Sequence, residues 1–239
     1  MRRPRHDPEV PQEIRKKHPL AIRWFHWVNF PVLALMIWSG LLILWANNVF
    51  TLFGHKVLSE DFFKMPLGKK DWSLEFRLAE GMSWHFLLAW FFTINGVLYV
   101  LYNIFSGEWR HIVPNRHSIK EAFQTVLHDL HIRKAPLPPA KFNGAQRIAY
   151  TMVVFMGLGS LLTGLAIYKP MQLSPLTQFL GGYSAARFEH FWLMIGFLLF
   201  FAIHIAQVAR AGWNNFRAMI TGRELAPVDA PLPEGEVAV

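Results

Sequence analysis

Apolar residues are gathered into four long stretches of this 239-residue chain. The stretches that contain no Asp, Glu, Lys or Arg are residues 24–55, 81–107, 148–168 and 190–209. Each is long enough to span a membrane, because a helix needs about 20 residues to cross a hydrocarbon core that is roughly 30 Å thick. The pattern therefore predicts transmembrane helices at about residues 24–46, 84–105, 148–168 and 190–209.

The order of residues inside these stretches favours helices over the strands of a membrane barrel. Barrel strands have about ten residues that alternate between apolar and polar, whereas residues 153–162 (VVFMGLGSLL) do not alternate. A helix also satisfies its own backbone hydrogen bonds in lipid. We therefore expect an all-α integral membrane protein, a four-helix bundle within residues 19–222. Residues 1–18 and 223–239 are expected to be disordered tails.

The net charge of +8 is distributed as a membrane topology requires. Of the 24 Lys and Arg residues, 17 lie before the first helix, between the second and third, and after the fourth, against 7 in the other two connections. Cytoplasmic segments carry such an excess. We expect a multi-pass protein of the bacterial inner membrane with both termini in the cytoplasm. Membrane lipid is an expected partner, and nucleic acid is not, because no nucleic-acid-binding motif accompanies the charge.

The chain contains no cysteine. Iron–sulfur clusters held by thiolates and haem attached through a C-x-x-C-H motif are therefore excluded. Any metal-containing group must be held by other side chains.

Four of the eleven histidines lie within the predicted helices: His26, His85, His190 and His204. Ionisable residues are costly inside a span and mark function. His190 and His204 are 14 residues apart, nearly four turns, so they share one helix face and lie about 21 Å apart along the axis. The second helix runs from outside to inside, so His85 near its start lies at the same outer depth as His190. The first helix runs from inside to outside, so His26 near its start lies at the same inner depth as His204. The arrangement predicts two stacked haems between the pairs His85/His190 and His26/His204.

Two glycines support this arrangement. Gly40 follows His26 by 14 residues, so it lies on the same helix face as His26 and at the depth of the outer haem. Gly96 follows His85 by 11 residues, about three turns, so it lies near the depth of the inner haem. A residue without a side chain lets a porphyrin approach the backbone. Close helix packing is the alternative role for the glycines, and hydrogen-bonded or proton-relaying side chains are the alternative for the histidines.

Four segments, in order along the chain, carry a resemblance to a known family. They are HPLAIRWFHWVN (18–29), MSWHFLLAWFFTINGVLYV (82–100), KFNGAQRIAY (141–150) and ARFEHFWLMIGFLLFFAIHIAQV (186–208). The chain resembles the prokaryotic di-haem b-type cytochromes, the membrane subunits of nickel–iron hydrogenase, formate dehydrogenase and thiosulfate reductase. It looks most like the form paired with periplasmic molybdopterin oxidoreductases, because GWNNFRAMITG (212–222) follows the last helix. The resemblance implies two haem b groups and assigns the axial ligand roles to the same four histidines.

The resemblance further implies a quinone site beside the inner haem, around the segment KFNGAQR. It assigns quinone contact to Asn143, with Gln146 and Gly144 as weaker candidates. A helix N-cap is the alternative role for Asn143. Three arginines near the membrane surfaces are candidates for binding haem propionates, with snorkelling to lipid headgroups as their alternative: Arg23, Arg187 and Arg210.

The sequence therefore predicts an electron-transfer subunit rather than a complete enzyme. We expect a di-haem cytochrome b that moves electrons between the quinone pool and a periplasmic catalytic subunit of the molybdopterin or hydrogenase type. One alternative is a stand-alone membrane oxidoreductase of the same fold that oxidises superoxide and reduces quinone. The other is a non-redox, proton-coupled membrane protein.

Overall fold

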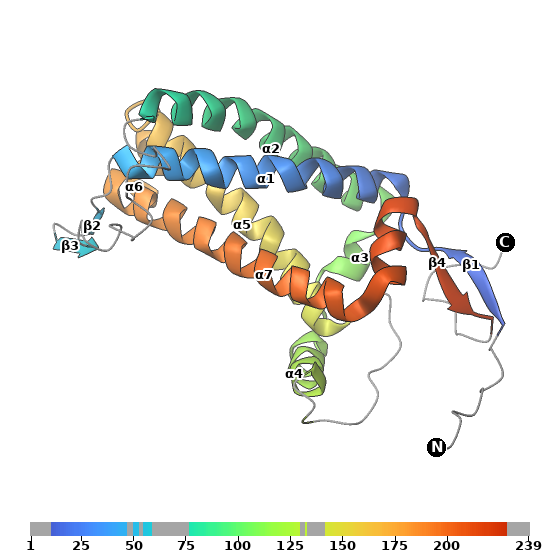
Figure 1. Ribbon diagram of the computed structural model, residues 1–239. Coiled ribbons are helices and arrows are strands. Elements are labelled where there is room, and N and C mark those ends of the chain that lie inside the picture. The colour runs from blue at the N-terminus through green and yellow to red at the C-terminus, as the bar shows by residue number, and fades with distance from the viewer. Residues whose placement is uncertain are drawn as a thin grey trace, which may run out of the picture. The chain divides into compact units, whose positions relative to one another are not determined.

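The structure is a computed structural model that describes residues 11–46, 50–52, 55–58, 77–129, 132 and 142–228. Four helices are long and apolar enough to cross a membrane (Figure 1). They are α1 (Leu20–Ala46), α2 (Leu78–Ser106), α5 (Gly144–Tyr168) and α7 (Tyr183–Thr221). The four predicted helices are confirmed. Each begins four to seven residues before its predicted start, because polar and charged residues continue the helix beyond the charge-free stretch.

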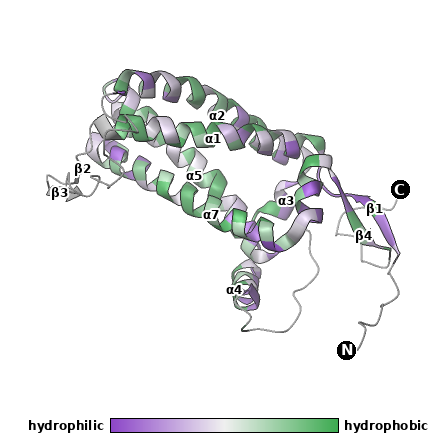
Figure 2. Ribbon diagram, in the orientation of Figure 1, coloured by the Kyte–Doolittle hydropathy of each residue, from purple (hydrophilic) through white to green (hydrophobic). Residues whose placement is uncertain are grey.

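The long helices consist largely of apolar residues, as Figure 2 shows, and many of these residues are exposed. Phe105 and Phe155, for example, are 85% and 67% exposed. Several polar side chains are buried instead, among them Ser39, Asn95 and Thr163. A protein in water has the reverse distribution, whereas lipid favours apolar surfaces. The chain is a multi-pass membrane protein.

Shorter elements connect the four spans. The connection between α2 and α5 contains α3 (Trp109–Ile112) and α4 (Ser118–Asp129), and the connection between α5 and α7 contains α6 (Ser174–Phe179). The strands β2 (Phe50–Leu52) and β3 (His55–Leu58) pair antiparallel between α1 and α2.

The chain forms two compact units. The first contains residues 1–24, 108–150 and 203–239, and the second contains residues 25–107 and 151–202. The first unit thus brings together the three segments that carry most of the basic residues. The second contains the greater part of all four spans.

In the second unit, α2 packs closely on α1 through Gly81. A Cβ atom at Gly81 would lie 2.8 Å from Leu42 Cβ and 3.1 Å from the Ser39 carbonyl oxygen, so only glycine permits this approach. Just before α2, the Arg77 guanidinium lies 5.8 Å from the Trp38 ring centroid, and its hydrogen bond with Glu80 raises the pKa of Arg77. The start of α2 is therefore fixed against the end of α1.

Glycines also bring α5 and α7 together. A Cβ atom at Gly159 would lie 3.2 Å from Leu193 Cδ1, and one at Gly196 would lie 2.8 Å from Met156 Sδ. Small residues at helix contacts are usual in membrane proteins, since van der Waals packing rather than the hydrophobic effect holds the helices together. These contacts hold α1 against α2 and α5 against α7.

In the first unit, the two ends of the described chain pair as strands. β1 (Gln12–Lys16) runs antiparallel to β4 (Arg223–Pro227), with Ile14 opposite Leu225. Both strands lie within segments expected to be disordered tails, and this expectation is corrected for residues 11–18 and 223–228. Residues 1–10 and 229–239 lie outside the described part of the chain.

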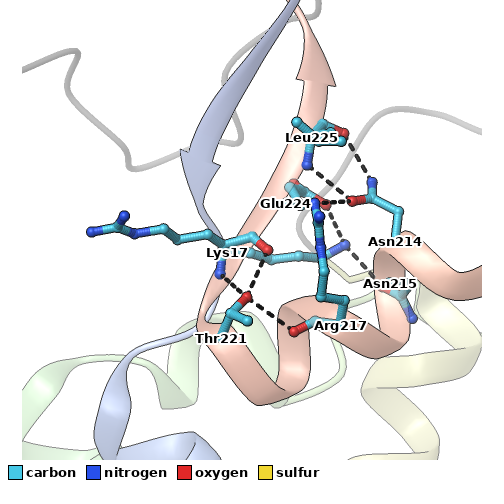
Figure 3. A network of polar contacts seen from close by, with 8 residues as sticks. Lys17, Asn214, Asn215, Arg217, Thr221, Glu224 and Leu225 are labelled. Carbon is cyan, nitrogen blue, oxygen red and sulfur yellow. Dashed lines mark hydrogen bonds and ion pairs between the residues drawn. The ribbon is translucent and has the colours of Figure 1, made fainter.

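A kink in α7 and a set of polar contacts hold β4 in place. Gly212 has φ 81° and ψ 177°, a conformation essentially restricted to glycine, and the helix resumes after it. Asn214 accepts a hydrogen bond from Leu225 N at 3.0 Å and donates one to Leu225 O at 2.9 Å. Lys17 Nζ contacts Glu224 at 2.6 Å and Asn215 at 2.9 Å, as Figure 3 shows. These polar contacts attach the two-stranded sheet to the last part of α7, and they stabilise it in place of a hydrophobic core.

Candidate functional site

His85 of α2 and His190 of α7 face each other in the second unit. Their ring centroids are 6.2 Å apart, and the ring planes are inclined at 71°. Both rings are half-buried. The sequence predicted this pairing from depth alone, and the structure places the two rings beside each other.

A hydroxyl from α1 fixes the imidazole of His85. Ser39 Oγ lies 3.0 Å from His85 Nδ1 and donates its proton to the Met36 carbonyl oxygen at 3.1 Å. A serine hydroxyl has only one proton, so Ser39 must accept a hydrogen bond from Nδ1–H. Nε2 of His85 then keeps its lone pair and is the nitrogen able to bind a metal.

A hydroxyl from α5 fixes His190 in the same way. Thr163 Oγ1 lies 2.9 Å from His190 Nδ1 and donates to the Gly159 carbonyl oxygen at 2.7 Å. The Thr163 residue is 3% exposed, so water does not compete for this bond. Because the single hydroxyl proton of Thr163 is used in this way, Nδ1 of His190 carries the imidazole proton and Nε2 keeps its lone pair.

A glycine follows each of these hydroxyl residues. A Cβ atom at Gly40 would lie 3.3 Å from His85 Cε1, and one at Gly164 would lie 3.4 Å from His190 Cε1. Most real Cβ contacts are longer, so each glycine makes room for an imidazole. Gly40 was expected at the depth of the outer haem, and it lies beside His85.

His85 and His190 are residues that would hold the iron of a haem between them. An imidazole nitrogen lies about 2 Å from a bound transition metal such as zinc, so opposed imidazoles on one ion have nitrogens about 4 Å apart and ring centres further apart still. The 6.2 Å between the ring centroids agrees with this spacing. A hydrogen-bonded Nδ1 is also the usual support of a metal-binding histidine.

The inner pair, His26 and His204, stays a prediction. His26 lies in α1 with its ring 5.0 Å from that of Trp27, centroid to centroid. His204 is half-buried in α7, and the helix is regular from Tyr183 up to the kink at Gly212. The 14-residue spacing from His190 is therefore unbroken helix. A Cβ atom at Gly96 would meet nothing within 4 Å.

Asn143 and Gln146 form a reciprocal cap at the start of α5. Gln146 N donates to Asn143 Oδ1 at 2.9 Å, and Asn143 N donates to Gln146 Oε1 at 3.0 Å. This is the capping box of a helix N-terminus. The N-cap role that was the alternative for Asn143 is thus present, and contact with a quinone stays a prediction for both residues.

The three candidate propionate ligands lie at different places. Arg23 donates to the Ile220 carbonyl oxygen, and Arg210 pairs with Asp129 at 3.2 Å. The Arg187 guanidinium lies 6.0 Å from the Tyr183 ring centroid. None of these contacts tests the propionate role, which stays a prediction.

Sequence reasoning missed three residues of the outer site: Ser39, Thr163 and Gly164. A signal was present, because a hydroxyl residue followed by glycine occurs within the first span and again within the third. These two hydroxyl–glycine pairs prove to be the contacts of His85 and His190.

Comparison with known proteins identifies the family. A model of the family described as prokaryotic cytochrome b561 matches residues 17–222. The chain is also 31% identical over 212 residues to a protein of Azospira oryzae named "Putative protein-methionine-sulfoxide reductase subunit YedZ1". That match covers 88% of this chain and 98% of the relative. The chain belongs to the prokaryotic cytochrome b561 family and is a membrane protein that binds haem b.

Proposed function

We propose that this protein binds two haem b groups and carries electrons between the quinone pool and a periplasmic molybdopterin reductase. The observation that carries the proposal is the geometry of His85 and His190, with ring centroids 6.2 Å apart and each Nδ1 bound to a hydroxyl. Haem b bound between such imidazoles supplies reversible one-electron transfer. The rest of this account concerns what the protein's own residues contribute.

The outer site is formed by two similar halves. Ser39 holds His85, and Thr163 holds His190, so each imidazole is fixed in the tautomer that presents Nε2. Because each hydroxyl proton is bound to a carbonyl of its own helix, neither hydroxyl competes for Nε2. Both imidazoles are thus prepared to bind iron before the cofactor arrives.

The second haem is proposed between His26 and His204. An unbroken helix separates His190 from His204, and 14 residues rise about 21 Å. Two haems at that separation would divide electron transfer across the bilayer into shorter steps.

Quinone is proposed to react near Asn143 and Gln146, at the start of α5. Quinol oxidation releases two electrons and two protons, so a site near the membrane surface lets the protons leave to water. The first unit, to which both residues belong, also has a shallow, open apolar depression at the α7 kink, lined by Val208, Ala209, Gly212, Trp213 and Phe216. Such a lining suits an isoprenoid tail.

The topology is proposed from charge. With 17 of the 24 Lys and Arg residues in the terminal segments and the connection between α2 and α5, these segments face the cytoplasm of an inner membrane. His85 and His190 are then at the periplasmic end. We propose Arg23, Arg187 and Arg210 as partners for the haem propionates.

The partner is proposed from the relative of known name, a reductase subunit. Reduction of a methionine sulfoxide to methionine and water consumes two electrons and two protons. Quinol oxidation releases two of each, so the two half-reactions balance. A catalytic subunit that reduces a sulfoxide is therefore a chemically matched acceptor on the periplasmic side.

The proposal is tested with the purified, haem-loaded protein in vesicles. Addition of a quinol should reduce both haems, and addition of the co-purified periplasmic subunit with a sulfoxide should reoxidise them. Superoxide oxidation and quinone reduction by this chain alone would favour the stand-alone enzyme instead. Absence of b-type absorption bands from the purified protein would contradict the haem assignment altogether.

A further inference from the structure

Helix α4 has its polar side toward the protein and its apolar side outward. Ser118 is fully buried and Thr125 is 7% exposed. Ile119, Phe123 and Val126 are 76%, 65% and 50% exposed. At 100° per residue these three side chains fall within one narrow sector of the helix. A helix that only covered a protein core would be oriented the other way.

The inner side of α4 is fixed to the start of the third span. A Cβ atom at Gly144, the first residue of α5, would lie 2.3 Å from the Ser118 carbonyl oxygen and 2.6 Å from Glu121 Cβ. Only glycine allows α4 to lie so close. The first half of α4 is therefore held at the level where a membrane-spanning helix begins.

The far end of α4 is fixed to the fourth span. Asp129 accepts a hydrogen bond from Gln207 Nε2 at 2.7 Å and pairs with Arg210 at 3.2 Å. Asn115 forms the turn that precedes α4, since its side-chain oxygen accepts from His117 N at 3.0 Å. The helix is thus fixed at both ends, and its outward face is set by contacts rather than by free rotation.

We propose that α4 is a membrane-surface helix whose face of Ile119, Phe123 and Val126 inserts into the boundary between lipid headgroups and acyl chains. A bilayer is the occupant that the position favours, because α4 lies against the first residue of one span and against residues of another. Amphipathic helices lie in this interface with their apolar side chains in the acyl region. The exposed cations Arg116 and Lys120, at the start of the helix, match the anionic headgroups. This proposal rests on the membrane-spanning fold and is independent of the electron-transfer proposal.

The absence of cysteine allows a direct test with single-cysteine variants. Ile119→Cys and Phe123→Cys probe the apolar face. Lys120→Cys is the matched control, because it is adjacent in sequence and exposed but lies about 100° around the helix from Ile119. Each full-length, haem-loaded variant is labelled with an environment-sensitive fluorophore and placed in vesicles of phosphatidylcholine and phosphatidylglycerol. An unchanged haem spectrum shows that each variant is folded.

Labels at residues 119 and 123 should be quenched severalfold more strongly by spin-labelled lipid than the label at residue 120. They should be quenched less by aqueous iodide. Equal iodide quenching at all three positions would overturn the proposal, because the face would then be in water. Protection from iodide without quenching by lipid would also overturn it, because another protein surface or a second copy of the chain would then cover the face.

Discussion

The hydroxyl of Thr163 accepts a hydrogen bond from Nδ1 of His190 over a distance of 2.9 Å. Its own proton is directed to the Gly159 carbonyl oxygen at 2.7 Å, which leaves the hydroxyl oxygen to accept from Nδ1–H. Ser39 and His85 repeat this relationship on the other side of the site. The two bonds prepare both imidazoles to coordinate iron through Nε2.

Replacing Thr163 by Val should weaken haem binding at the outer site. The side chain keeps its shape but loses the hydroxyl that holds His190, and loss of such a supporting contact lowers metal affinity by about 10–100-fold. Haem retention and the reduction potential of the outer haem are the measurements. Thr163→Ser, which keeps the hydroxyl, is the control and should restore both. A Val variant indistinguishable from the parent protein in both measurements would exclude the positioning role.

Replacing Gly81 by Ala should separate α2 from α1. The added Cβ would lie 2.8 Å from Leu42 Cβ, and overpacking of this kind costs about 1–3 kcal/mol. His85 lies one turn further along α2, so its bond to Ser39 should weaken as well. The measurement is thermal unfolding together with haem content. Gly157→Ala is the control, because its Cβ would make an ordinary 3.6 Å contact with Phe92; equal effects of the two variants would contradict this packing account.

Asn143 has a capping role that is separable from its proposed quinone role. Asn143→Ala should lower stability by about 0.5–2 kcal/mol through loss of the N-cap. Asn143→Ser keeps a capping oxygen but removes the amide, so it should retain stability and lose quinol oxidation. The measurements are thermal unfolding and quinol-driven haem reduction. Full quinol oxidation by the Ser variant would show that Asn143 acts only as a helix cap.

Asn214 should hold β4 in place. Asn214→Ala removes two hydrogen bonds to Leu225, each with a net contribution of about 0.5–1.5 kcal/mol. Amide hydrogen exchange of residues 223–227 should therefore become faster. Asn215→Ala is the milder control, since Lys17 keeps its contact with Glu224. Unchanged exchange in the Asn214 variant would mean that the strand is held by β1 alone.

The four spans were readable from the sequence for physical reasons. Absence of charge over 20 or more residues is a local property, and depth in a bilayer follows from position along each helix. The same reasoning selected His85 and His190, whose rings the structure places together. A membrane makes the depth of a residue easier to predict, because successive spans cross it in opposite directions.

Other features depend on contacts that a sequence does not display. A hydroxyl in a helix commonly bonds a carbonyl one turn earlier, so the residue type alone did not single out Ser39 or Thr163. The pairing of β1 with β4 joins short polar segments from opposite ends of the chain. The outward apolar face of α4 depends on which side of the helix Gly144 contacts.

The central claim is that His85 and His190 are the two axial ligands of one haem. The most direct measurement is electron paramagnetic resonance of the oxidised protein, combined with haem quantification, for His85→Ala and His190→Ala. We predict that each variant loses the same low-spin haem signal and retains one haem per chain, whereas His26→Ala and His204→Ala lose the other signal. If His85→Ala and His190→Ala removed different signals, or left both haems in place, the pairing would be contradicted.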